Sequence, residues 1–381
     1  MAGGSASYIV RLKGKVKLRA GVAYDFDRGG YRAESTEDDL ATPSSRSDCQ
    51  SAVFSFSVHK IKGMLRADAG LHLARVSSDA SRMRWKLLPE ASLTLNFSKL
   101  HSLELSYESS LSRDGAVPWT ATRRLAGYRT LYDFAAREEM LHLCHNADLF
   151  YMFYDRFADI SVNLFGGINV EMSPCAPDVS TRADALVESR ASSTRSDRGA
   201  YFQLSVDKGF AIPLRAKIDA RGQGSLAPVL YDGDKYTSRA YDLTADISLK
   251  TRFRAPLNVE AGGTYGFART AIGLMADPSE WRSYTIRVQP IAASKKLGLK
   301  ARVPVSYVRD MSNGQKAEYV DLSFEATKKL GAHFSVFTEA RDLLHSDRQE
   351  RVTTSVSGDT EDTATESRMP GFIVAGFKWI F

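Results

Sequence analysis

The chain has 381 residues, of which 43% are hydrophobic and 25% charged, and this composition excludes a disordered or collagen-like protein. Its net charge of +6 is modest and its basic residues are scattered, so no nucleic-acid partner is expected. No window of about 18 apolar residues predicts a transmembrane helix, and the first ten residues lack the pattern of a secretory signal.

Apolar and polar residues alternate strictly in many short segments from one end of the chain to the other. A period of two is typical of β-strands, whose successive side chains point to opposite faces. No stretch has a helical period over three turns, so the sequence predicts an all-β chain. In chain order the alternating segments include 16–27, 65–75, 91–98, 101–109, 159–167, 201–209, 214–222, 241–250, 257–269, 284–290, 319–326 and 334–340.

The connections between these segments are of two kinds that alternate along the chain. Short and often basic turns occur near residues 13, 60, 100, 156, 210, 254, 296 and 330. Longer connections, rich in Ser, Asp, Thr and Arg, are expected at 28–47, 78–82, 113–138, 175–197, 226–236, 269–280, 311–315 and 345–365. Unbroken alternation predicts antiparallel up-and-down hairpins with two unlike ends, as in bacterial outer-membrane barrels with tight periplasmic turns.

The predicted strands are long enough to cross a membrane. A tilted strand needs about ten residues to do so, and charged residues such as Asp242 and Glu260 fall on the polar face. We therefore predict a transmembrane β-barrel of about 16–17 strands, with residues 1–381 as one domain that contacts lipid and lipopolysaccharide in the bacterial outer membrane. The alternative is a soluble sandwich, propeller or solenoid, but no blade repeat of roughly 40–45 residues occurs.

The direction of the first strand suggests that this sequence lacks the first part of the barrel. If the last strand runs toward the periplasm, counting back makes the short segment 5–12 run the same way. A barrel whose N-terminus lies in the periplasm would begin with a strand in the opposite direction. We therefore expect the first strand to be truncated and an N-terminal part to be missing.

Three segments, 96–113, 127–134 and 143–155, resemble the barrel portion of TonB-dependent receptors and related receptor-like outer-membrane proteins. The closing hairpin 319–346, with Arg341 to Leu344 after its strand, is similar to the penultimate strands of the same family. The resemblance implies a parent barrel of about 22 strands with a plugged lumen, of which the plug domain is absent here.

The implied function is binding and uptake of a nutrient. TonB-type energy coupling through the missing N-terminal part and a surface lipoprotein are the implied partners. A self-sufficient, porin-like passive channel of about 16 strands is the alternative, and a structural or adhesion barrel is a third hypothesis.

Residues that could carry chemistry are few. His142, Cys144 and His145 form the only metal-like cluster, but His145 points away from the other two in a strand, so no metal site is expected. No catalytic motif occurs, and none of the seven histidines has a recognisable activating neighbour, so we predict neither enzymatic activity nor a cofactor. Whether Cys144 pairs with Cys175 stays open.

The long segment 113–138 carries the aromatic residues Trp119, Tyr128 and Tyr132, which could stack on a ligand such as a sugar or a chelate. The alternative is that such outer loops only fold over the mouth of the barrel.

The chain ends on alternate apolar residues. Ile373, Phe377, Trp379 and Phe381 fall on one predicted lipid-facing row of the last strand. This row resembles the signal by which the barrel-assembly machinery engages a closing strand, so that machinery is an expected partner.

Overall fold

The protein is described here from a computed structural model. The described residues are 2–12, 16–32, 44–62, 64–78, 81–113, 122–127, 130–134, 141–172, 175–182, 185–192, 196–254, 256–273, 278–331, 333–344, 349–357, 360–368 and 371–379. All 25 regular elements within these ranges are β-strands, which confirms the all-β prediction. In these same ranges, no helix has the length and apolar character needed to span a membrane.

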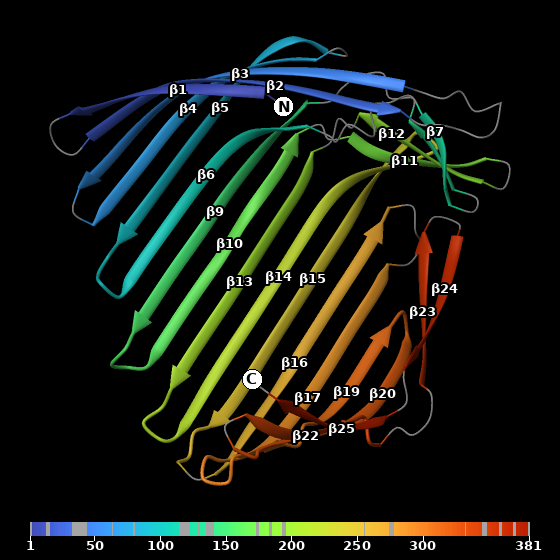
Figure 1. Ribbon diagram of the computed structural model, residues 1–381. Coiled ribbons are helices and arrows are strands. Elements are labelled where there is room, and N and C mark those ends of the chain that lie inside the picture. The colour runs from blue at the N-terminus through green and yellow to red at the C-terminus, as the bar shows by residue number, and fades with distance from the viewer. Residues whose placement is uncertain are drawn as a thin grey trace. The chain divides into compact units, whose positions relative to one another are not determined.

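The strands follow one another along the chain, and most pair with the strand next in sequence (Figure 1). Their bounds are β1 (Ala2–Leu12), β2 (Val16–Arg32), β3 (Ser44–Lys62), β4 (Leu65–Ser78), β5 (Ser81–Asn96), β6 (His101–Arg113), β7 (Thr122–Gly127), β8 (Thr130–Phe134), β9 (Leu141–Asp155), β10 (Ile160–Met172), β11 (Cys175–Arg182), β12 (Ala185–Ser192), β13 (Asp197–Gly209), β14 (Leu214–Tyr231), β15 (Asp234–Thr251), β16 (Leu257–Ile272), β17 (Ser279–Ser294), β18 (Leu299–Arg302), β19 (Val305–Ser312), β20 (Gln315–Leu322), β21 (Phe324–Lys329), β22 (Phe334–Arg341), β23 (Gln349–Ser357), β24 (Thr360–Arg368) and β25 (Phe372–Trp379).

The chain divides into two compact units. The first comprises residues 1–152, 165–201 and 225–239, and the second comprises residues 153–164, 202–224 and 240–381. Strands β9, β10, β13, β14 and β15 contribute residues to both units. Each unit is described in turn.

In the first unit, β1 to β6 form a continuous run of antiparallel neighbours (Figure 1). One face of this run is apolar and exposed. Val22 lies opposite Phe54, Phe54 opposite Leu73, and Leu73 opposite Leu87, so the four side chains form one row across four strands. An exposed apolar row of this kind suits a face that meets lipid.

The second unit repeats this arrangement in the run from β16 to β22 and β25. Ile286, Tyr307 and Val320 lie opposite one another on three strands and are 62%, 38% and 40% exposed. The next residues along the strands, Arg287 and Ser306 among them, form a polar row on the other face. The strands therefore have one lipid-facing and one polar side, as the alternation predicts.

Four of the short strands, β18 to β21, are the parts of two longer strands that are each interrupted once. β17 pairs with β18 and β19 in one unbroken register, and β21 and β20 continue that register on the far side. The break falls at Pro304, which has no backbone N–H to donate to the ladder, while its carbonyl accepts a hydrogen bond from the Ser323 N–H at 2.9 Å. The pairs β18–β19 and β20–β21 are thus the halves of two long strands.

Three hairpins lie in or overlap connections that the sequence analysis predicts as long loops. Hairpins β7–β8 and β11–β12 lie within 113–138 and 175–197, and β23–β24 begins within 345–365 and ends at Arg368. Two short parallel pairings, β8 with β12 and β11 with β14, link the first two hairpins and join them to the sheet. Their sequences carry no strict alternation of apolar and polar residues, so they give no period-two hydrophobic signal even though their backbones pair.

The number of long strands agrees with the prediction. Of the 25 strands in the described part of the chain, six form these three hairpins and two pairs are halves of one strand, which leaves 17. The prediction of an antiparallel up-and-down fold with about 16–17 strands is therefore confirmed.

Two of the predicted longer connections are in fact tight turns. Asp232–Gly233 joins β14 to β15, and Asn313–Gly314 joins β19 to β20, with φ of 50° and 83° in the first and 47° and 83° in the second. Two successive positive φ angles are those of a type I′ turn, which Asp-Gly and Asn-Gly sequences favour. Short and long connections therefore do not alternate at 226–236 and 311–315.

Replacing Ile286 by lysine tests the lipid-facing row. We expect Ile286→Lys to lower the free energy of unfolding in lipid vesicles by about 2–4 kcal/mol if the side chain lies near the middle of the bilayer. The neighbouring Thr285→Lys, on the polar face, is the matched control and should change it by less than about 1 kcal/mol. Urea titration followed by tryptophan fluorescence measures both, and equal losses would contradict the assignment of faces.

A methyl group at Gly262 should disturb the contact between β15 and β16. A Cβ there would lie 2.6 Å from the carbonyl oxygen of Ile247, and a backbone atom cannot move aside as a side chain can. We expect Gly262→Ala to lower the free energy of unfolding by about 1–3 kcal/mol in the same titration. Gly4→Ala is the control, because nothing lies within 4 Å of a Cβ at Gly4; an equally stable Gly262→Ala would refute the close approach.

Candidate functional site

The polar face of the second unit carries a network of charged side chains. Strand β15 supplies Asp246 and Lys250, which alternate with the exposed apolar residues Ile247 and Leu249. Because side chains two residues apart share a face of a strand, the sequence alone puts both charges on one side. Residues of β16, β17, β18 and β21 complete the network.

Arg287 of β17 makes an ion pair with Asp246 of β15. Its Nη2 lies 3.2 Å and 3.1 Å from the two carboxylate oxygens, and the Thr264 hydroxyl donates to the same carboxylate at 2.7 Å. Gly262 of β16, which lies between the two strands, is directly opposite Arg287. The pair therefore neutralises one positive charge on this face.

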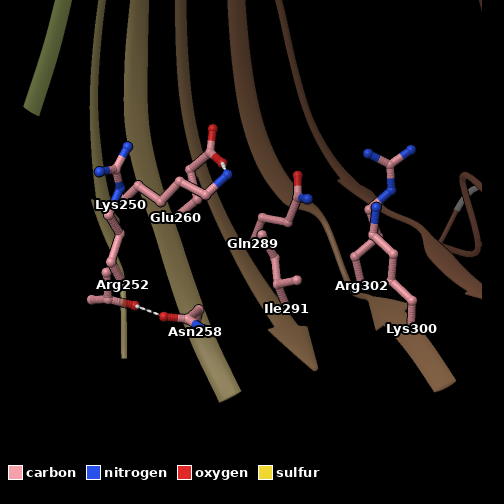
Figure 2. A pocket seen from close by; sticks show the side chains of 9 residues that line it. Lys250, Arg252, Asn258, Glu260, Gln289, Ile291, Lys300 and Arg302 are labelled. Carbon is pink, nitrogen blue, oxygen red and sulfur yellow. Dashed lines mark hydrogen bonds and ion pairs between the residues drawn. The ribbon is translucent and has the colours of Figure 1, made fainter. Parts of the chain in front are cut away.

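A cavity of about 420 Å³ lies at the end of this face near the short turns after β15 and β17. Four cationic side chains line it, two from β15 and the residue after it and two from β18 (Figure 2). We call this cavity the basic pocket, and its residues are Lys250, Thr251, Arg252, Asn258, Glu260, Gln289, Ile291, Lys300 and Arg302.

Two of the four cations have carboxylate partners. Lys250 Nζ lies 3.3 Å from Glu260 Oε2, and Arg302 contacts the Glu325 carboxylate through Nε at 2.6 Å and Nη2 at 2.5 Å. Within the described part of the chain, Arg252 and Lys300 form no ion pair. The basic pocket therefore keeps an excess of positive charge.

The backbone that carries these cations is held by hydrogen bonds. The Arg252 N–H donates to the Pro213 carbonyl at 2.7 Å, and the neighbouring Phe253 N–H donates to Asn258 Oδ1 at 2.7 Å. The Val259 N–H donates to the Thr251 hydroxyl at 2.8 Å. These bonds tie the end of β15 to the start of β16 and to the Pro213 carbonyl, so they position the backbone from which the Arg252 side chain extends.

The polar face of the first unit differs in chemistry, because histidines there pair with carboxylates. His59 Nδ1 contacts Asp68 Oδ1, the Ser92 hydroxyl lies 3.5 Å from the other oxygen of Asp68, and His72 Nε2 lies 3.1 Å from Glu90 Oε2. The prediction that no histidine has an activating neighbour is therefore wrong. The partners are far apart in sequence and meet only through the pairing of β3, β4 and β5.

Most of the aromatic residues that are predicted to contact a ligand lie outside the described residues. Trp119 and Tyr128 lie outside the described residues, and only the backbone of Tyr132 is described. Tyr132 belongs to β8, opposite Arg124 of β7 and Glu188 of β12. Their role in ligand contact stays a prediction.

The metal-like cluster is only partly described. The His145 ring nitrogen Nδ1 lies 2.8 Å from the Tyr107 hydroxyl, and the two rings stack. The side chains of His142 and Cys175 lie outside the described residues, so the pairing of Cys144 with Cys175 stays open. Among the described side chains, no group of three His, Cys, Asp or Glu could hold a metal ion.

Three of the four predicted residues of the C-terminal row lie in β25. Ile373, Phe377 and Trp379 are 71%, 72% and 59% exposed, and the rings of Phe377 and Trp379 pack against Phe334 of β22. Phe381 lies outside the described residues. The row exists as an exposed face, and its recognition by the assembly machinery stays a prediction.

Sequence reasoning missed the basic pocket. The signal was present, because the short turns near residues 254 and 296 are basic. What the sequence did not provide was the pairing that brings β15, β16, β17 and β18 to one cavity.

No family model matches the chain, and no curated protein sequence matches it. The chain is similar in structure to OmpT, an outer-membrane protein of Vibrio cholerae, at 10% identity and a TM-score of 0.35 over 98% of this chain and 99% of that one. An anion-selective porin from Comamonas acidovorans is 12% identical, with a TM-score of 0.30 over 99% of this chain and 98% of that one.

A mutant of the ferric enterobactin receptor from Pseudomonas aeruginosa is 9% identical, with a TM-score of 0.31 over 99% of this chain and 78% of that one. The chain's own long antiparallel strands, each with one apolar and one polar face, give it the fold class of the outer-membrane β-barrels. The exposed apolar face of these strands places the chain in the bacterial outer membrane, which confirms the location predicted from the sequence.

The prediction that the chain is not an enzyme is withdrawn. It depended on the absence of a paired histidine, and His59–Asp68 and His72–Glu90 are such pairs. A fold class does not by itself exclude catalysis, because the same fold can carry different functional sites.

The ion pair between Arg302 and Glu325 can be measured by a double-mutant cycle. With Arg302→Met and Glu325→Gln, we expect a coupling of about 0.2–1 kcal/mol in the free energy of unfolding, because both side chains are partly exposed. A cycle of Arg302→Met with Glu280→Gln is the control. Glu280 lies at the other end of β17 beside Arg282, so its coupling should be about zero. Similar coupling in both cycles would contradict a specific pair.

Proposed function

We propose that the chain is the transport barrel of an outer-membrane protein that takes up polar nutrients. The observation that carries this proposal is the contrast between the two faces of β15 to β21. The apolar side chains of Leu249, Ile286 and Val305 are exposed on one face, while Asp246, Arg287 and Glu260 occupy the other. Charged side chains of this number are stable in a membrane only where their face meets water.

The narrower proposal is a TonB-dependent receptor-like protein, in which outer loops capture the nutrient and a plug domain gates its passage. The resemblance of segments 96–113, 127–134 and 143–155 supports it. The alternative is a porin-like passive channel made by this chain alone. In both hypotheses, lipid and lipopolysaccharide surround the apolar face, and the assembly machinery engages the row of Ile373, Phe377 and Trp379. The receptor hypothesis adds TonB-type energy coupling and a surface lipoprotein as partners.

Conductance of the purified chain tests the proposal. The chain would be refolded in detergent, checked for heat-modifiable migration on a gel and added to a planar lipid bilayer in potassium chloride. Stepwise increases in current are expected, because a charged polar face supports a water-filled path. The boiled chain is the control.

The same measurement separates the narrower hypotheses. A chain that migrates as a heat-modifiable barrel and conducts steadily supports the passive channel. A chain that fails to give a heat-modifiable form supports the receptor portion, which needs further strands. A folded chain without current contradicts transport through this polar face.

A further inference from the structure

We propose that the basic pocket binds small solutes that carry a phosphate-type dianion. This inference rests on the proposed transport function only for the path by which the solute arrives. The pocket itself is defined by Lys250, Arg252, Lys300 and Arg302 (Figure 2).

The charge of the pocket favours a dianion. Four cationic side chains line it, and Glu260 and Glu325 are the carboxylates paired with two of them. Arg252 and Lys300 thus keep their full charges, and among the described residues neither has an ion-pair partner. A ligand with two negative charges would compensate both, whereas a cationic solute would be repelled.

The donor groups suit phosphate oxygens. Arginine presents a planar fork of N–H donors that matches phosphate geometry, and lysine adds a compact ammonium with three donors. Lys250 and Arg302 are 50% and 45% exposed, so their charged groups are accessible from the cavity. Gln289 borders the same cavity and adds an amide group, whereas the Asn258 amide is hydrogen-bonded to the Phe253 backbone.

The position of the pocket favours a dissolved solute over a lipid headgroup. Register places Glu260 opposite Gln289 and Asn258 opposite Ile291 on the face that carries the charges, while Leu257 and Val288 are exposed on the opposite face. A lipid would approach the apolar face. The cationic groups therefore meet water on the polar side of the strands.

Equilibrium binding of inorganic phosphate to the refolded chain in detergent tests the proposal, with isothermal titration calorimetry as the measurement. We expect saturable binding that weakens about 10-fold or more in the double variant Arg252→Gln, Lys300→Gln, because each lost charge removes a charge-assisted hydrogen bond. The double variant Lys295→Gln, Lys296→Gln is the matched control. It removes the same charge from the exposed turn after β17, outside the pocket lining, and should bind within about 2-fold of the unchanged chain.

Three results would overturn the proposal. The first is a folded chain without saturable phosphate binding, and the second is equal weakening of phosphate binding in the control variant. The third is that the chain does not bind phosphate but binds vesicles that contain anionic lipid, and that this binding is lost in the Arg252→Gln, Lys300→Gln variant. If the double variant does not fold, the single variant Lys300→Gln is compared with the unchanged chain instead, and its affinity for phosphate is expected to fall about 5-fold or more. Unchanged binding in that folded single variant would also overturn the proposal.

The test separates the site from the proposed transport function, because calorimetry needs no ion flux. A chain that conducts potassium chloride but does not bind phosphate retains the transport function and loses the site. A chain that binds phosphate in the pocket without conducting retains the site and contradicts transport.

Discussion

The structure depends on one constraint, which is that every backbone N–H and C=O in the hydrocarbon layer must find a partner on a neighbouring strand. Consecutive antiparallel pairing meets this constraint, and it also sets the register. In the first unit, register aligns Val22, Phe54, Leu73 and Leu87 in one exposed row. A slip of one residue would turn polar residues beside this row, such as Ser55 and His72, toward lipid.

The same constraint leaves the other face free for polar chemistry. Charged residues there cost little, because water or a carboxylate on the next strand compensates them. The first unit uses this freedom for histidine–carboxylate pairs, and the second uses it for the Arg287–Asp246 pair and for the basic pocket. The hydrogen bond from the Phe253 N–H to the Asn258 side chain ties the backbone next to Arg252 to β16.

Much of the fold could be predicted, because a period of two is a local property of the sequence. It identified the all-β class, the two faces and the number of long strands. The hairpins β7–β8, β11–β12 and β23–β24 escaped prediction, since polar strands held by backbone pairing carry no hydrophobic period. Asp232–Gly233 and Asn313–Gly314 were predicted as longer connections because polar residues flank them, although each Asp-Gly or Asn-Gly pair is a turn signal by itself.

The sequence by itself determined the face on which each strand residue lies, because side-chain direction alternates along a single strand and needs no partner. Only the tertiary structure decided which residues meet across strands. Lys250 and Lys300 line one cavity, and Arg287 of β17 reaches Asp246 of β15, because strand register brings distant segments together. Register depends on all the strands at once, and for that reason neither the basic pocket nor the His59–Asp68 pair could be found from spacing along the chain.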